Sequence, residues 1–217
     1  MEDLIILGSG VHACEIVEII GRINAQHPTW DVLGFLSSDK SEVGKEKVGR
    51  PVLGTFEDIS DYPQARFVVA EVPNQGKFAK KLGLPSERFA TIIDPTCFVS
   101  RTAKIGNGCV LYPRCYVGLE TRIDDFVFSL SGTIINHHDV IEEGVCITSN
   151  VNLAGGVYVE RDSYLGAGTM VRGEVRIGAE AYTGMGSVII KDVAARTVVV
   201  GNPARKLRDV EELLSSE

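Results

Sequence analysis

The sequence predicts a small α/β domain followed by a triangular parallel β-helix, and three observations support this prediction. Residues 93–194 divide without insertion into 17 units of six residues. Ahead of them, short apolar runs alternate with segments of helical periodicity. A glycine-rich turn joins the first apolar run to the first helical segment. The predicted parts are residues 1–90, residues 91–202, and a C-terminal cap with a short helix at residues 203–217.

The six-residue unit has two apolar positions. The first position is Ile, Leu or Val in 15 of the 17 units, with Ser129 and Thr183 as exceptions. The fifth is a small residue or Val in all units but one, where Asp139 stands. A helix repeats at about 3.6 residues and a strand at about 2, so this unit fits one short strand and one turn. Three consecutive units then make one coil, and both apolar positions face inward. At a strand spacing of about 4.8 Å the prism would be roughly 27 Å tall. Glycine at the second position suits a tight turn, as at Gly106, Gly118, Gly166, Gly178 and Gly184.

The N-terminal part reads as a small parallel sheet with helices. Strands are predicted at residues 3–7, 32–36 and 66–70, and helices around residues 16–23 and 76–82. Gly8, Ser9 and Gly10 lie between the first strand and the first helix, where glycine lets the backbone approach a phosphate. Plain strand–helix packing is the alternative, because a GSG turn alone is a weak signal. Ala13 is tolerated at the third glycine of the dinucleotide fingerprint, but neither Asp31 nor Asp39 clearly ends a strand, as the acidic residue of a nicotinamide site would.

Composition and charge exclude several classes of protein. The net charge of −7 argues against a broad nucleic-acid surface, which needs a positive patch. The N-terminus lacks the pattern of a signal peptide, and no apolar run approaches the roughly 20 residues of a membrane-spanning helix. We therefore expect a cytoplasmic protein without membrane contact. Five cysteines without a CxxC pair predict neither a disulfide framework nor a zinc site, and no metal is expected.

Five motifs give the chain a family resemblance: GSGVHA at 8–13, PVLG at 51–54, FVVA at 67–70, INHHDVI at 135–141 and GNPARKLR at 201–208. With them, nearly the whole chain resembles the sialic acid O-acetyltransferases and bacillosamine-pathway sugar N-acetyltransferases. These are hexapeptide-repeat acyltransferases. The resemblance implies a left-handed β-helix, acetyl-CoA as co-substrate, and a nucleotide-linked amino sugar or a sugar hydroxyl as acceptor. It also implies a homotrimer with CoA between neighbouring prisms. An amine acceptor is slightly favoured.

The resemblance makes His137 the general base. An imidazole is largely neutral at pH 7 and can take a proton from an attacking amine or hydroxyl. A step of one coil leads from His137 to Gly155, and a second such step leads to Gly173. Such a column would form an open groove floor, with the Gly155 N–H as donor to the developing oxyanion. Glycines that merely make turns are the alternative interpretation.

Three positions around this base depart from the family pattern. His138 stands where the family usually has an acid, and the acid is displaced to Asp139 on an inward position. A buried carboxylate is costly unless paired, so we expect Asp139 to orient His138 or His137. For His138, an exposed turn residue is the alternative. Cys146 replaces a second histidine at the acetyl-CoA site, where we expect it to pack against the thioester. A nucleophilic role for Cys146 is a second possibility.

The remaining candidate residues flank the two substrates. Pro203 and Arg205 would border the CoA nucleotide, with a solvated capping turn as the alternative. Gly8, Ser9, Gly10 and His12 would bind the nucleotide sugar. Two other functions stay open. The altered residues around the base favour a non-catalytic scaffold relative, and the β-helix by itself also allows an acyltransferase that uses another acyl-CoA.

Overall fold

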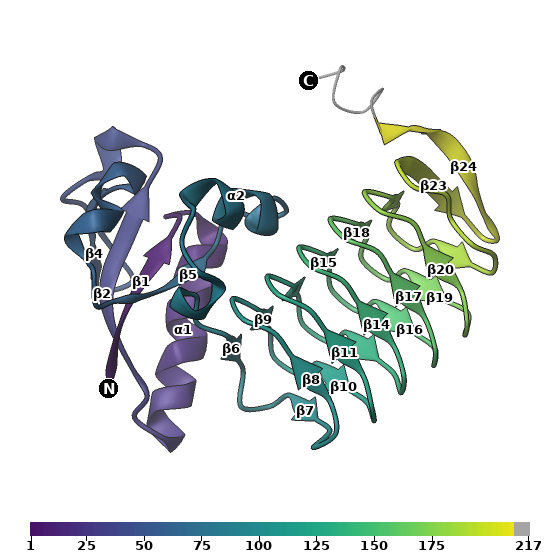
Figure 1. The fold of residues 1–217 in the computed structure, drawn as a ribbon, viewed down its shortest axis with the longest axis horizontal. Helices are drawn as coiled ribbons and strands as arrows, with labels where there is room; N and C mark the ends of the chain where they lie inside the picture. Colours follow the sequence, from purple (N-terminus) through teal and green to yellow (C-terminus); the bar gives the residue numbers. More distant parts are fainter. Residues whose placement is uncertain (211–217) are drawn as a thin grey trace.

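The structure is a computed structural model that describes residues 1–210. An α/β domain lies at one end, the coils of a β-helix follow along the long axis, and a hairpin lies at the far end (Figure 1). The helix expected at residues 213 and 214 lies outside the described residues.

The N-terminal sheet has the strand order β3-β4-β2-β1-β5. Strands β1 (Glu2–Leu7), β2 (Trp30–Ser37), β4 (Arg50–Thr55) and β5 (Arg66–Val69) are parallel, and β3 (Glu46–Lys47) pairs antiparallel with β4. The predicted parallel sheet is therefore confirmed. Strands β3 and β4 were missed, because Pro51 and Gly54 interrupt the apolar pattern there.

Two helices cover opposite faces of this sheet. Helix α1 (Val11–Gln26) packs on the face that carries Leu4 and Ile6. Helix α2 (Gln75–Leu82) packs on the face that carries Ile5 and Leu7. Strand alternation sends successive side chains to opposite faces, which is why a short apolar run serves both layers. Short 3-10 helices complete the domain: η1 (Lys40–Glu42), η2 (Phe56–Asp61) and η3 (Ser86–Arg88).

The repeat folds into two-residue parallel strands on three faces, as the six-residue period predicts. The β6 face contains β6 (Ile92–Ile93), β9 (Val110–Leu111), β12 (Phe128–Ser129), β15 (Cys146–Ile147), β18 (Tyr164–Leu165) and β21 (Tyr182–Thr183). The β7 face contains β7 (Phe98–Val99), β10 (Tyr116–Val117), β13 (Ile134–Ile135), β16 (Asn152–Leu153), β19 (Met170–Val171) and β22 (Val188–Ile189). The β8 face contains β8 (Lys104–Ile105), β11 (Arg122–Ile123), β14 (Val140–Ile141), β17 (Tyr158–Val159) and β20 (Arg176–Ile177). Strands β23 (Thr197–Gly201) and β24 (Ala204–Asp209) form the closing hairpin.

Neighbouring strands of each face are one coil apart in the sequence, as in the pair Tyr116 and Ile134. The first and fifth positions fill the inside of the prism. The three polar exceptions, Ser129, Thr183 and Asp139, are also fully buried.

The turn glycines correct one expectation. The left-handed backbone is found at the fourth position, where it includes non-glycine residues such as Glu120 (φ 55°) and His138 (φ 61°). Glycine at the second position has a different cause: a Cβ on Gly118 would lie 2.7 Å from the backbone nitrogen of His137 in the next coil. Close contact with the next coil, rather than turn conformation, therefore accounts for glycine at Gly118.

The N-terminal domain contacts two corners of the prism. Beside α1, Tyr112 donates a hydrogen bond to Glu15 at the corner between the β6 and β7 faces. At α2, Gln75 donates to the carbonyls of Phe126 and Gly144 at the corner between the β8 and β6 faces. The third corner, between the β7 and β8 faces, carries the two neighbouring histidines and is called the histidine corner below. No hydrogen bond or ion pair within residues 1–210 joins the N-terminal domain to it.

Over the same range, residues 1–210, no helix combines the length and the apolar character needed to cross a bilayer.

Candidate functional site

His137 and His138 lie on the turn between β13 and β14, exposed at the histidine corner. Their Nδ1 atoms are 3.0 Å apart, and the rings meet edge to face. The edge of the His137 ring lies against Gly155 of the next coil. A Cβ built on Gly155 would be 2.6 Å from His137 Nε2 and 2.8 Å from Nδ1. The imidazole therefore occupies the space that any other residue at position 155 would fill.

The backbone around Gly155 leaves one donor free. The N–H of Gly156 donates to the His137 carbonyl (3.0 Å), and the Gly155 carbonyl accepts from Glu174 N–H (3.2 Å). The N–H of Gly155 itself has no acceptor among residues 1–210. A free amide beside an imidazole is a suitable donor to a developing oxyanion.

The column of His137 continues along the histidine corner through equivalent turn positions, and this row of positions is called the groove below. Gly155 and Gly173 follow at one and two coils, and a third step of one coil leads to Lys191. Lys191 lines a cavity of about 390 Å³ at the C-terminal end of the prism, together with Arg205 and Lys206. Three coils span about 14 Å at a spacing of about 4.8 Å. This row of turn positions thus leads from the imidazole of His137 at one end to the basic cavity at the other.

The residues of this groove fit an extended coenzyme A. A thioester at His137 would meet a proton acceptor and a free amide. Phosphates at the far end would meet the cations of Lys191 and Arg205. Arg205 was expected here from the sequence, and Pro203 lies in the turn between β23 and β24 beside it. Lys191 was missed, although one more coil step from Gly173 finds it.

Asp139 does not contact either histidine, contrary to expectation. One carboxylate oxygen accepts from the N–H of Asn136 and the other from the N–H of Val157, both at 2.7 Å. The Asn136 side chain then donates to the Leu153 carbonyl in the adjacent coil. Burial raises the pKa of Asp139 to about 7, against the lowering effect of these backbone donors. Because the fifth position points inward, the carboxyl shapes the histidine turn from below and cannot reach an imidazole.

A different acid reaches the histidines. Glu120 lies one coil before His138, and its Oε2 is 2.9 Å from His138 Nε2. Glu120 was missed in the sequence, although a step of one coil back from His138 points to it.

Cys146 lies away from the groove, which corrects the expected contact with acetyl-CoA. It is 1% exposed on β15, paired with Phe128 and Tyr164 on the β6 face. Its sixth hexad position puts it on a strand, whereas the groove runs along turn positions. Burial raises the pKa of this thiol to about 12, which opposes a nucleophilic role.

The glycine-rich turn leads directly into α1. Gly8 adopts φ 114°, and Gly10 precedes a helix whose first turn has no acidic residue and no side-chain cap. The Ser9 hydroxyl is occupied: it contacts Ser37 Oγ at 2.8 Å and donates to Glu42. Hydrogen bonds from Lys47 and Ser9 lower the pKa of Glu42. A phosphate at this turn would therefore meet backbone amides and not the Ser9 side chain.

His12 connects the N-terminal domain to the prism. Its Nδ1 lies 3.1 Å from Glu15 Oε2 and 3.2 Å from the Tyr112 hydroxyl, and its ring packs edge-on against Phe128. The structure therefore gives His12 a packing role between domains, beside the predicted role in substrate binding.

A cavity of about 370 Å³ lies beside the glycine-rich turn at residues 8–10. Its lining comprises the loop after β5 and one side of α2, with Glu71, Val72, Asn74, Lys77, Phe78 and Lys81. The carboxylate of Glu71 faces Gly8, and burial raises its pKa. The lining thus combines the loop at residues 71–74 with two lysines of α2.

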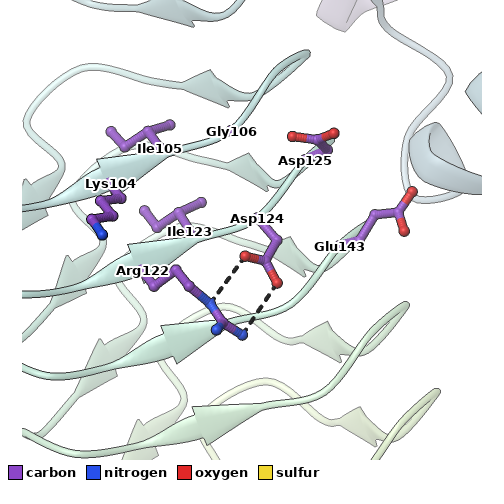
Figure 2. A pocket seen from close by; sticks show the side chains of 8 residues that line it. All are labelled: Lys104, Ile105, Gly106, Arg122, Ile123, Asp124, Asp125 and Glu143. Carbon is purple, nitrogen blue, oxygen red and sulfur yellow. Dashed lines mark hydrogen bonds and ion pairs between the residues drawn. The ribbon is translucent and has the colours of Figure 1, made fainter. Parts of the chain in front are cut away.

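A further cavity of about 520 Å³ lies on the β8 face (Figure 2). Its lining includes Arg122, Asp124, Asp125 and Glu143, and Arg122 Nε is paired with Asp124 Oδ1 at 3.1 Å. Because Arg122 is already paired with Asp124 and most of the other charged lining residues are acidic, this cavity does not favour a phosphate. Within residues 1–210, no three His, Cys, Asp or Glu side chains form a group that could hold a metal ion.

Several solved structures share this architecture over nearly the whole chain. The acetyltransferase domain of PglB from Neisseria gonorrhoeae is 25% identical, with a TM-score of 0.82 over 95% of this chain and 100% of that one. The same domain in complex with acetyl coenzyme A gives a TM-score of 0.83. PerB from Caulobacter crescentus, in complex with CoA and GDP-perosamine, is 22% identical with a TM-score of 0.84, over 95% and 97% of the two chains. WeeI from Acinetobacter baumannii is 22% identical with a TM-score of 0.70, over 95% of this chain and 100% of that one. The last two identities establish the fold alone.

Curated relatives match a part of the chain. The acyl-[acyl-carrier-protein]–UDP-N-acetylglucosamine O-acyltransferase of Pseudomonas aeruginosa is 41% identical over 85 residues, which is 39% of this chain and 33% of the relative. The chain thus spans about a third of the length of the curated relatives that it matches. No protein-family profile matches the chain. The fold and the repeat are nevertheless those of the hexapeptide-repeat acyltransferases, with a left-handed β-helix, as the sequence predicted. The specific likeness to sialic acid O-acetyltransferases stays a prediction.

Proposed function

We propose that this protein is an acetyl-CoA-dependent N-acetyltransferase that acts on an amino sugar carried by a nucleotide. One observation supports this most: His137, the free N–H of Gly155 and the basic cavity at Lys191 lie in one row of turn positions, about 14 Å long, on the histidine corner. Such a groove offers a proton acceptor, an oxyanion donor and a phosphate site in the order in which acetyl-CoA would present its parts.

The chemistry follows from the positions of these groups. His137 Nε2 accepts a proton from the amine as the amine nitrogen bonds to the thioester carbon. The Gly155 N–H donates to the carbonyl oxygen as that oxygen becomes negative. When the carbon–sulfur bond breaks, the imidazolium returns its proton to the leaving sulfur. The products are an amide and a free thiol, and His137 is neutral again.

The acceptor site requires a second copy of the chain. Gly8, Ser9, Gly10 and the cavity at residues 71–81 belong to the domain that contacts the other two corners, so one chain does not bring them to His137. A neighbouring copy would supply them across the histidine corner. The outer side of the adjacent β7 face suits such contact, since it is apolar except for Asn152: Phe98, Tyr116, Ile134, Asn152, Met170 and Val188. Phe98 and Met170 are 56% and 53% exposed, and an exposed apolar patch marks an interface. We propose a homotrimer, because a three-sided prism with one such face closes by threefold rotation.

The choice of substrates follows the relatives. PglB binds acetyl-CoA and PerB binds CoA and GDP-perosamine according to their names, which supports acetyl-CoA and a nucleotide-linked amino sugar here. The five cysteines are all free, which is usual in a reducing compartment, and we place the enzyme in the cytoplasm. The curated relatives name an acyl carrier protein as donor, so transfer of a longer acyl group is the second candidate function.

Thiol-release kinetics with acetyl-CoA and a panel of nucleotide-linked amino sugars tests the proposal. We expect turnover with at least one amine acceptor, and a loss of about 100-fold or more in kcat for His137→Ala, the range of a lost general base. His27→Ala is the control, because this exposed histidine caps α1 in the N-terminal domain and is not part of the histidine corner. Full activity in His137→Ala would refute the mechanism, and turnover only with longer acyl donors would favour the second candidate.

A further inference from the structure

Three side chains on the histidine corner form a chain of polar contacts, called the series below. Glu120 Oε2 is 2.9 Å from His138 Nε2, and His138 Nδ1 is 3.0 Å from His137 Nδ1. The series therefore runs from a carboxylate through one imidazole to the imidazole that lies on Gly155.

The coils hold this series in register. The N–H of His138 donates to the Leu119 carbonyl, and the N–H of Glu120 donates to Thr102 Oγ1, both at 2.9 Å. His138 and Glu120 also share the left-handed backbone of the fourth position. Their side chains leave successive coils from equivalent points, so the stacking of the coils brings them together.

Hydrogen-bond complementarity fixes the protons of the series. A carboxylate only accepts, so His138 carries its proton on Nε2 and donates it to Glu120. The Nδ1 of neutral His138 is then an acceptor, and the facing Nδ1 of His137 must be the donor. This leaves the lone pair of His137 on Nε2, which lies 2.6 Å from a Cβ built on Gly155, against 2.8 Å for Nδ1.

We infer that Glu120 and His138 are positioning residues that hold His137 in the tautomer with a free Nε2. The inference rests on the proposed function and adds residues to its mechanism. Nε2 takes the proton of the attacking amine while Nδ1–H stays bonded to His138. The charge of the imidazolium is balanced by Glu120 through His138, and no proton has to reach the carboxylate. The leaving thiolate then takes the proton back from Nε2.

A double-mutant cycle tests the series with kinetics. Glu120→Gln removes the charge, and His138→Phe removes both ring nitrogens at a position type that already holds Phe126 with φ 58°. We expect each change to lower kcat about tenfold with KM unchanged. In the background of His138→Phe, Glu120→Gln should cost nothing further, because Glu120 acts only through His138. If the losses in kcat of the two single variants multiply in the double variant, the inference is overturned.

The control is Glu57→Gln. Glu57 is an exposed carboxylate of η2 that pairs with Lys40 and lies in neither candidate substrate site. The change removes one surface carboxylate of an ion pair, as Glu120→Gln does, and should leave kcat unchanged.

Nitrogen-15 NMR of the imidazoles tests the series without any turnover. At mildly alkaline pH, wild-type His137 should show a protonated Nδ1 and an unprotonated Nε2, and Glu120→Gln should shift His137 toward a mixture of tautomers. This signature supports the inference even if no acceptor sugar reacts, in which case only the proposed function fails. Identical His137 spectra in wild type and Glu120→Gln would overturn the inference, even in an active enzyme.

Discussion

At the residue scale, Gly155 matters because it has no Cβ. Its backbone lies outside the left-handed region, so alanine meets no conformational strain there, yet a Cβ would overlap the His137 ring. Glycine at position 155 therefore leaves room for the imidazole of His137, and its role is not to form a turn. This distinguishes it from Gly156 beside it, where φ is 76°.

Gly155→Ala should lower kcat about 100-fold while the protein stays folded, because a displacement of about 1 Å at a reacting group has a cost of that size. Thiol-release kinetics and the unfolding temperature, measured together, check this. Wild-type kcat in a folded Gly155→Ala protein would show that His137 does not act from its observed place.

Asp139 is a residue whose ionisation couples to folding. Its pKa is raised to about 7 in the folded protein, against about 3.9 in an unfolded chain. Between these values the folded state binds the extra proton, so this group favours folding below about pH 4 and loses that contribution as the pH rises to about 7.

The free energy of unfolding of wild type should therefore fall relative to that of Asp139→Asn as the pH rises from about 4 to about 7, by up to roughly 4 kcal/mol. Urea titrations of both proteins across this range measure the difference. A constant difference would mean that Asp139 is ionised throughout, held by the N–H groups of Asn136 and Val157.

At the element scale, glycine has three separate roles in this chain. Second-position glycines admit the next coil, fourth-position glycines adopt the left-handed turn, and Gly155 seats an imidazole. A fourth case is Gly21 within α1, where a Cβ would meet nothing within 4 Å. Glycine in a helix interior costs conformational entropy with no packing gain.

Gly21→Ala should consequently stabilise the protein by about 0.5–1 kcal/mol. Gly118→Ala should do the reverse, because its Cβ would lie 2.7 Å from the His137 backbone nitrogen. Chemical denaturation of the two variants beside wild type tests the contrast. Equal stabilities would mean that the coils can separate locally to admit a methyl group.

At the scale of the whole molecule, the β7 face differs from the β8 face. The outer positions of the β8 face carry Lys104, Arg122 and Arg176, whereas those of the β7 face are apolar except for Asn152. Burying the β7 face between copies removes apolar surface from water. The same contact would bring an N-terminal domain to the histidine corner of its neighbour.

Met170→Glu should therefore dissociate the assembly and abolish activity together, because a buried unpaired carboxylate is costly. Light scattering coupled to size exclusion measures the mass, and thiol release measures the activity. Val43→Glu, at an exposed apolar residue of the N-terminal domain, is the control. A Met170→Glu protein that keeps the wild-type mass and activity would exclude the β7 face as the interface.

The sequence alone determined the prism and the stack of His137 on Gly155. Both follow from an uninterrupted period of six, because parallel coils turn sequence spacing directly into vertical neighbours. The parallel sheet and the α1 helix also followed from local patterns of apolar residues.

Only the tertiary structure decided the surroundings of that stack. Asp139 turned out to bind backbone amides, Cys146 proved to be buried on a strand, and Glu120 took the place of the expected acid. The left-handed turn sets the direction in which a side chain points, and packing between coils decides which groups it contacts. Neither can be read from the six-residue spacing of the sequence. The docking of the N-terminal domain away from the histidine corner likewise depends on contacts between distant segments, such as Gln75 with Gly144.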